Sequence, residues 1–84
     1  MYSIEFSRSA EKKLFKLEKN VQERIIYAME RLRFRPFDFV KKLIGSPYYR
    51  LKVGEYRLIL DIKRNKLIIF VIYIGHRKSV YKRL

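Results

Sequence analysis

The stretch that decides the fold runs from Tyr48 to Ile62 and reads Tyr-Tyr-Arg-Leu-Lys-Val-Gly-Glu-Tyr-Arg-Leu-Ile-Leu-Asp-Ile. Apolar and polar residues alternate on both sides of Gly54 and Glu55, which is the period of a half-buried β-strand. Glycine tolerates the positive φ angle of a tight turn, so these two residues are predicted to join two strands in a hairpin. One face of the hairpin then packs on a core, and the other presents the cations Arg50, Lys52 and Arg57.

The segments before the hairpin predict one strand and two helices. Residues 2–6 alternate in polarity and indicate a short strand. A helix follows with Ser7 or Ser9 as its cap, because apolar residues then recur every three or four positions. We expect a second helix from a cap at Asn20 to a stop at Pro36, since proline lacks the amide hydrogen that a helix interior needs. Two such helices in succession form a helical hairpin.

The segments after the hairpin complete the sheet. Residues 67–74 are apolar on both faces, as in a strand in the middle of a sheet. A turn is predicted over residues 75–79, and residues 80–84 close the chain as a short helix or strand. The element order predicts one domain, residues 1–84, with an α+β fold. In it, an N-terminal strand and a helical hairpin pack on one face of a mostly antiparallel sheet, and a short C-terminal segment follows.

Composition and charge exclude several classes of protein and favour one class of partner. The 84 residues include no cysteine and one histidine, so disulfide frameworks, thiolate zinc sites and cysteine nucleophiles are excluded. We therefore expect no metal site and no cofactor. The net charge is +13, and residues 50–84 hold ten basic residues against two acidic ones. Such a charge draws a protein onto polyanions through counterion release, which predicts a nucleic-acid partner for the second half of the chain.

Nothing in the sequence predicts a membrane protein. The longest apolar run, residues 67–74, is far shorter than the ~20 residues that a transmembrane helix needs. The first residues also lack the pattern of a secretory signal peptide. We therefore expect a soluble, cytoplasmic protein.

Three features of the sequence are candidates for a site: the cationic hairpin face, the segment around Arg77, and Tyr81. If residues 67–74 pair beside the strand that carries Arg57, their C-terminal end brings Arg77 and Tyr81 near that face. Several cations and one phenol would then surround a single groove. RNA carries its own nucleophile in the 2′-OH, so such a groove could cleave it by orienting the phosphate and stabilising its charge. Neighbouring cations favour the phenolate form of a tyrosine, which would let Tyr81 act as a base.

Four runs of this sequence form a combination typical of one family: residues 6–11, 42–45, 49–60 and 74–81. Together they resemble the RelE/ParE toxin superfamily, and its RelE-like branch in particular. The resemblance covers nearly the whole chain, and its motifs are specific in combination rather than singly.

The resemblance implies a toxin of a type II toxin-antitoxin system that enters the ribosomal A site and cleaves mRNA. It implies that Arg57 and Arg77 stabilise the phosphate and that Tyr81 accepts the proton. It also implies a small antitoxin, RelB-like and acidic, bound to the toxin in a hetero-oligomer. The residues expected to contact RNA are Arg50, Lys52, His76 and Lys78.

Two other functions remain open from the sequence. A ParE-like toxin would bind and inhibit DNA gyrase without nuclease activity. A non-catalytic nucleic-acid-binding module would use the charge alone and would not need Tyr81.

Several candidate residues also have ordinary structural interpretations. His76 is the only imidazole and could act as an acid or base, but a structural or substrate-contacting role in its turn is as plausible. Tyr81 could anchor the tail, and Asp61 could pair with Arg57 on the hairpin face. The outward lysines of the first helix are expected to be solvated surface: Lys12, Lys13, Lys16 and Lys19.

Overall fold

The hairpin predicted from the sequence is the centre of the structure, a computed structural model that describes residues 1–79. Strands β3 (Tyr49–Val53) and β4 (Tyr56–Lys63) pair in antiparallel fashion across a two-residue turn. Gly54 adopts a φ of 57° there, a conformation that costs glycine little. The predicted hairpin and its turn are therefore confirmed.

The hairpin belongs to a five-stranded sheet with the order β1-β5-β4-β3-β2. Strand β1 (Ser3–Phe6) runs parallel to β5 (Ile68–His76), and all other neighbours are antiparallel. Strand β5 lies inside the sheet, between β1 and β4, which agrees with its apolar sequence. The edge strand β2 (Lys41–Lys42) was not predicted, because two residues are too short to carry a periodic pattern.

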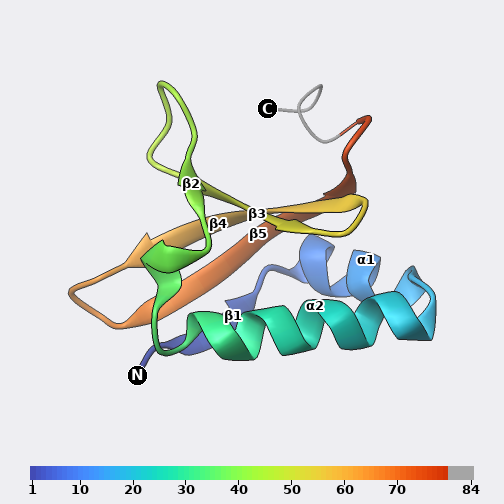
Figure 1. The fold of residues 1–84 in the computed structure, drawn as a ribbon, viewed down its shortest axis with the longest axis horizontal. Helices are drawn as coiled ribbons and strands as arrows, with labels where there is room; N and C mark the ends of the chain where they lie inside the picture. Colours follow the sequence, from blue (N-terminus) through green and yellow to red (C-terminus); the bar gives the residue numbers. More distant parts are fainter. Residues whose placement is uncertain (80–84) are drawn as a thin grey trace.

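Both helices, α1 (Arg8–Lys16) and α2 (Lys19–Leu32), cover the same face of the sheet, as Figure 1 shows below the strands. Ser7 caps α1, because its hydroxyl oxygen accepts a hydrogen bond of 3.1 Å from the amide of Ala10. The same hydroxyl donates to the carbonyl oxygen of Ile72 at 2.8 Å. The Ser7 side chain thus accepts a hydrogen bond from a free backbone amide at the start of α1 and also connects this helix to β5. The predicted α+β architecture is confirmed.

The predicted ends of the second helix were wrong. Helix α2 begins at Lys19, and the N-cap position before it is Glu18, whose side chain makes no capping hydrogen bond. The helix ends at Leu32, four residues before Pro36. A residue that precedes proline is driven out of the helical region, and Arg35 has a φ of −142° and a ψ of 68°. Pro36 instead opens the short 3₁₀ helix η1 (Pro36–Asp38), where its missing amide hydrogen does no harm.

Strand β5 extends further than predicted. The sequence placed a turn at Gly75, but Gly75 pairs with Arg57 and His76 pairs with Tyr56. The strand continues because β4 starts directly after the hairpin turn and offers pairing partners up to that point. Before the strand, Leu67 lies in the preceding turn with a φ of 54°. The turn after β5 therefore comprises Arg77, Lys78 and Ser79.

The hydrophobic core lies between the helices and the covered face of the sheet. The strands and the helices both contribute fully buried aliphatic side chains, each of which stabilises the fold by about 1.5–3 kcal/mol through removal from water. The large side chains of this core that are less than 3% exposed are Ile25, Met29, Leu32, Leu58, Leu60, Ile69, Val71 and Ile74.

Leu58→Ala is expected to lower the free energy of unfolding by about 2–5 kcal/mol, because it leaves a cavity beside β3 and β5. Urea unfolding followed by circular dichroism measures the change. Ile44→Ala is the matched control, since Ile44 is fully exposed and its replacement should change stability by less than about 0.5 kcal/mol. Equal unfolding midpoints for the two variants would contradict the burial of Leu58 in the core.

Candidate nucleic-acid interface

The cations of the hairpin lie together on the face of the sheet opposite the helices. Lys52 pairs with Arg57 across the hairpin, and Arg57 pairs on its other side with Gly75 of β5. Arg50 lies between Lys41 of β2 and Ile59 of β4. Alternate residues of these strands face the core, so the cations share the face that no helix covers. We call this the cationic face: Lys41, Arg50, Lys52 and Arg57.

Arg57 is held at the hairpin turn. Its Nη1 donates hydrogen bonds of 2.9 Å to the carbonyl oxygens of Gly54 and Tyr56. The alternative that Asp61 pairs with Arg57 is wrong, because the carboxylate of Asp61 contacts Lys63 Nζ at 3.3 Å. A guanidinium has five N–H donors, so these two bonds position the group while it retains donors for a phosphate.

Arg77 is bound to the same turn through Glu55. Its backbone amide donates to the carbonyl oxygen of Glu55 at 2.8 Å, and its Nε lies 3.0 Å from the carboxylate of Glu55. The structure therefore places Arg57 and Arg77, which are twenty positions apart in the sequence, at the two residues of one hairpin turn. The sequence did not predict that Glu55 binds Arg77, because no periodic pattern identifies the acidic residue that a distant arginine will contact.

His76 has contacts at both ring nitrogens. Its Nε2 lies 3.6 Å from the carboxylate of Glu55, and its Nδ1 accepts a hydrogen bond of 3.2 Å from the amide of Lys78. The ring also packs edge-on against Tyr56, with 5.7 Å between centroids. These contacts order the segment that carries Arg77, which favours a structural role for His76. Lys78 is exposed in the turn that follows.

The uncovered face also contains apolar and aromatic side chains. Ile59 is fully buried there, although it lies outside the main core cluster. Tyr73, its partner on β5, extends over Gly75, where a Cβ atom would lie 2.7 Å from the tyrosine ring. Glycine at position 75 therefore lets the Tyr73 ring lie against the strand, and a larger residue there would displace the ring. The candidate interface therefore includes the aromatic ring of Tyr73 beside Arg57, and the sequence alone did not indicate this ring.

Tyr81, the predicted proton acceptor, lies outside the residues that the structure describes, as does the rest of the predicted C-terminal segment. Its role stays a prediction. Among residues 1–79, no cluster of three or more histidine or acidic side chains could hold a metal ion. The helices of that part of the chain include none that is long and apolar enough to cross a membrane.

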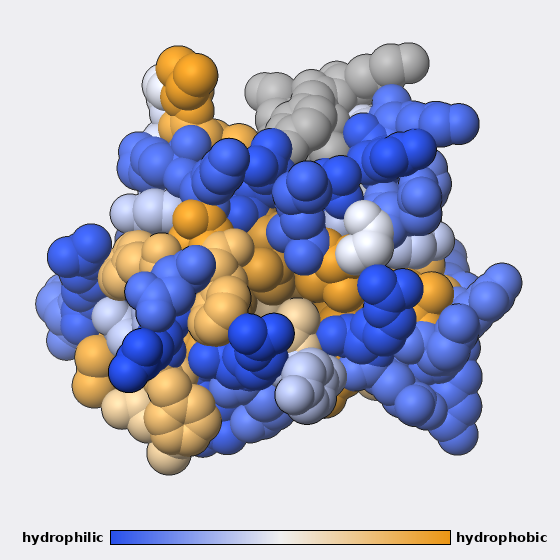
Figure 2. Space-filling view, viewed as in Figure 1, coloured by the Kyte–Doolittle hydropathy of each residue, from blue (hydrophilic) through white to orange (hydrophobic). Residues whose placement is uncertain are grey.

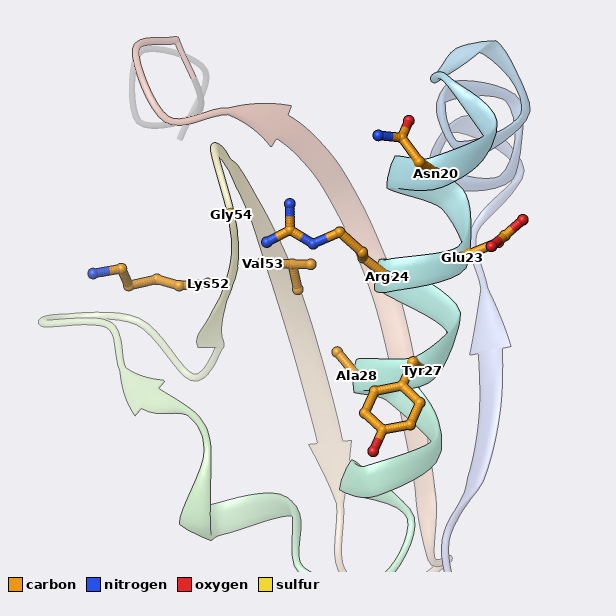
Figure 3. A pocket seen from close by; sticks show the side chains of 8 residues that line it. All are labelled: Asn20, Glu23, Arg24, Tyr27, Ala28, Lys52, Val53 and Gly54. Atoms are coloured by element: carbon orange, nitrogen blue, oxygen red, sulfur yellow. The ribbon is translucent and has the colours of Figure 1, made fainter.

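A groove of about 650 Å³ runs between α2 and the outer edge of β3. Strand β2 pairs only with Tyr49 and Arg50, so within residues 1–79 no strand covers the edge of β3 beyond them. Apolar surface is visible in this band between the strands and α2 (Figure 2). Arg24 reaches from α2 toward Val53 and Gly54, whereas Lys52 points away from the helix (Figure 3). The groove therefore meets the cationic face at Lys52, which lines the groove and belongs to that face.

Residues 4–81 match a family model described as the ParE toxin of the type II toxin-antitoxin system parDE. Among proteins with curated annotation, none matches the chain significantly. The family match includes nearly every element of the fold and both arginines at the hairpin turn.

Solved structures of toxins share this fold. The intact E. coli RelBE toxin-antitoxin complex matches with a TM-score of 0.80 and 28% identity, covering 90% of this chain and 96% of that chain. The isolated E. coli RelE toxin matches with a TM-score of 0.79 and 26% identity over 100% of both chains. The archaeal RelE-RelB complex from Pyrococcus horikoshii OT3 matches with a TM-score of 0.80 and 25% identity, covering 90% and 94%.

Proposed function

This chain belongs to the ParE toxin family of type II toxin-antitoxin systems, within the RelE/ParE superfamily, and on that premise we propose that it is a RelE-like, ribosome-dependent endoribonuclease. It would cleave mRNA in the ribosomal A site and so inhibit translation. The observation that carries the proposal is the meeting of Arg57 and Arg77 at one hairpin turn beside an uncovered cationic face. Two guanidinium groups at one place suit a phosphate that gains charge during cleavage.

In the proposed reaction the 2′-OH of the RNA gives its proton to the phenolate of Tyr81, and the 2′-oxygen attacks the adjacent phosphorus. The bond from phosphorus to the 5′-oxygen then breaks, the leaving oxygen takes a proton from solvent, and a 2′,3′-cyclic phosphate remains. Arg57 and Arg77 stabilise the extra negative charge on the phosphate oxygens. The strand itself is held by the remaining predicted contacts: Arg50, Lys52, His76 and Lys78.

Purified toxin incubated with ribosomes that carry a defined mRNA tests this proposal. We expect cleavage of the mRNA on ribosomes and little cleavage of the same mRNA in free solution. Absence of cleavage under both conditions would overturn the proposal.

The second candidate is a ParE-like inhibitor of DNA gyrase without nuclease activity. It is favoured by the description of the matching family model. A gyrase supercoiling assay separates the two functions. Inhibition of supercoiling by the toxin together with intact mRNA would select the gyrase function.

We also propose an acidic, RelB-like antitoxin as the partner of this toxin in a hetero-oligomer. The E. coli and P. horikoshii structures above contain RelE together with RelB. An acidic chain would offset the net charge of +13 and compete with RNA for the cationic face. A ribosomal target implies a cytoplasmic location.

Glu55→Gln is expected to tighten RNA binding by about two- to fivefold, because the carboxylate that now occupies Arg77 also repels a phosphate. Stability should change by less than about 1 kcal/mol, since the ion pair is exposed. Glu30→Gln is a closely matched control: Glu30 has the same exposure as Glu55 and makes an ion pair of the same 3.0 Å length with Arg33. Fluorescence anisotropy with a labelled RNA measures both variants. Equal affinities for the two would contradict competition at Arg77.

A further inference from the structure

A second cationic cleft lies between α1 and the C-terminal end of β5. Its volume is about 570 Å³. Helix α1 lines it with three lysines, and β5 lines it with an aromatic ring and with the histidine that precedes Arg77. The residues that matter here are Lys12, Lys13, Lys16, Tyr73, Gly75 and His76.

The cleft exists because β1 is shorter than β5. Strand β1 ends at Phe6, opposite Val71. Ser7 then donates its backbone amide to the carbonyl oxygen of Val71 at 2.9 Å, and the chain turns away into α1. Strand β5 continues to His76, so its last residues have no further strand on their outer edge among the described residues. The first turns of α1 border this edge.

The charge of the cleft is not neutralised by its surroundings. Lys12, Lys13 and Lys16 are all exposed, and within residues 1–79 no carboxylate lies within 4.0 Å of their ammonium groups. The sequence predicted these lysines, together with Lys19, as solvated surface of the first helix, but Lys19 is the first residue of α2. They are solvated, but three of them converge on one concavity, whereas Lys19 does not line it. Convergent ammonium groups in a concave site attract an anion more strongly than dispersed ones do.

The remaining lining residues suit a single-stranded nucleic acid. Proteins that bind single strands combine a basic groove along the phosphates with aromatic rings on which bases stack. Tyr73 supplies a half-buried ring in this cleft. His76 lines the cleft and also contacts Glu55 at the hairpin turn, so the cleft borders the turn at which Arg57 and Arg77 are held.

We propose that the cleft between α1 and β5 is a second RNA-binding subsite, in which Lys12, Lys13 and Lys16 contact backbone phosphates flanking the cleaved one and Tyr73 stacks on a base. This inference rests on the proposed function, because it extends the same site. The phosphates can belong to the mRNA or to ribosomal RNA, since both present the same backbone. The lining combines three lysines with an aromatic ring, which suits a nucleic acid, whereas the groove beside α2 is the more apolar of the two.

The test compares the variant Lys12→Gln/Lys13→Gln/Lys16→Gln with the control Lys19→Gln/Lys63→Gln/Lys66→Gln. Both remove three positive charges from exposed positions, and glutamine keeps the helix propensity of lysine nearly unchanged at the positions that lie in α1 and α2. The probe is a short single-stranded RNA with 2′-O-methyl groups, which cannot be cleaved. Its affinity is measured over a series of salt concentrations, and circular dichroism checks that each variant is folded.

We expect the cleft variant to bind the probe more weakly. The slope of the logarithm of the binding constant against the logarithm of the salt concentration should become shallower by about 0.7 for each phosphate that is no longer neutralised, or by about two for three lysines. The control variant should change that slope by less than about 0.5, because its three lysines lie away from the proposed path of the RNA. Tyr73→Leu should weaken binding about tenfold with an unchanged slope, since it removes stacking and no charge.

A second set of measurements uses ribosomes without mRNA as the probe. Weaker affinity for the free RNA assigns the cleft to mRNA, and a weakening confined to ribosomes assigns it to ribosomal RNA; either result supports the subsite. Equal behaviour of the cleft and control variants toward both probes would overturn it. If the cleft variant binds both RNA probes normally and binds only the antitoxin more weakly, the subsite is also overturned. The cleft would then belong to the antitoxin interface.

Different measurements test the proposed function and the proposed subsite, so one can be contradicted while the other stands. The binding measurements do not depend on catalysis, so an inactive protein can still reveal the cleft. A protein that cleaves mRNA on ribosomes while its cleft variant binds like the control would retain the proposed function and lose only the subsite.

Discussion

Arg57→Ala is expected to slow the proposed cleavage of mRNA on ribosomes by about 10²–10³-fold, which is the usual cost of removing one preorganised donor to the transition state. The structure gives the physical reason. Two backbone carbonyls hold the guanidinium of Arg57 at the hairpin turn, so little reorganisation is needed when charge builds on a phosphate. Single-turnover cleavage measures the effect separately from product release.

Two further variants test whether the effect of Arg57→Ala depends on the position and on the guanidinium group of Arg57. Arg35→Ala removes the same charge from an exposed position and should leave the rate within about twofold of the wild type. Arg57→Lys keeps the charge but loses the planar group with its several donors, so most of the rate should still be lost. Cleavage by folded Arg57→Ala at the wild-type rate would remove Arg57 from the site.

Tyr81→Phe is expected to reduce the cleavage rate by about 10²–10⁴-fold, because it removes the proposed proton acceptor and nothing else. Affinity for the uncleavable RNA should remain unchanged, since the phenyl ring still fills the same space. This separation of rate from binding distinguishes a base from a residue that anchors the tail.

Tyr27→Phe is the matched control for Tyr81→Phe, because Tyr27 is largely exposed on α2 and its hydroxyl should not affect cleavage. If Tyr81→Phe cleaves as fast as Tyr27→Phe, the proton acceptor is another group. Weaker binding with an unchanged rate at saturation would instead give Tyr81 a role in holding RNA.

Local patterns predicted the parts of the fold that depend on neighbouring residues. The alternation around Gly54 predicted which side chains are buried, and Leu51 and Leu58 do pair on the covered face. Capping by Ser7 was also predictable, because a cap needs only a serine three residues before a free amide. The expected cap at Asn20 was wrong, since the N-cap of α2 is Glu18, two residues earlier, and its side chain makes no capping hydrogen bond.

The alternation of side chains along β5 did not predict which of its residues face the core. A strict period of two would place Val71 and Tyr73 on one face. The structure pairs Leu60 with Val71 but Ile59 with Tyr73, so Ile72 is an extra residue at a β-bulge. The bulge returns Ile74 to the core and turns Tyr73 toward the uncovered face. It depends on how β5 pairs with β4, which is a contact between distant parts of the chain.

The sequence by itself determined the hairpin, the two amphipathic helices, the excess of positive charge and the residues able to bind a phosphate. These follow from the side-chain period and from charge, which are properties of adjacent residues. Only the tertiary structure decided that Arg57 and Arg77 meet at Gly54 and Glu55, and that three lysines of α1 lie beside the end of β5. Such meetings depend on strand order, register and the length of β1, and these are set when the whole core packs.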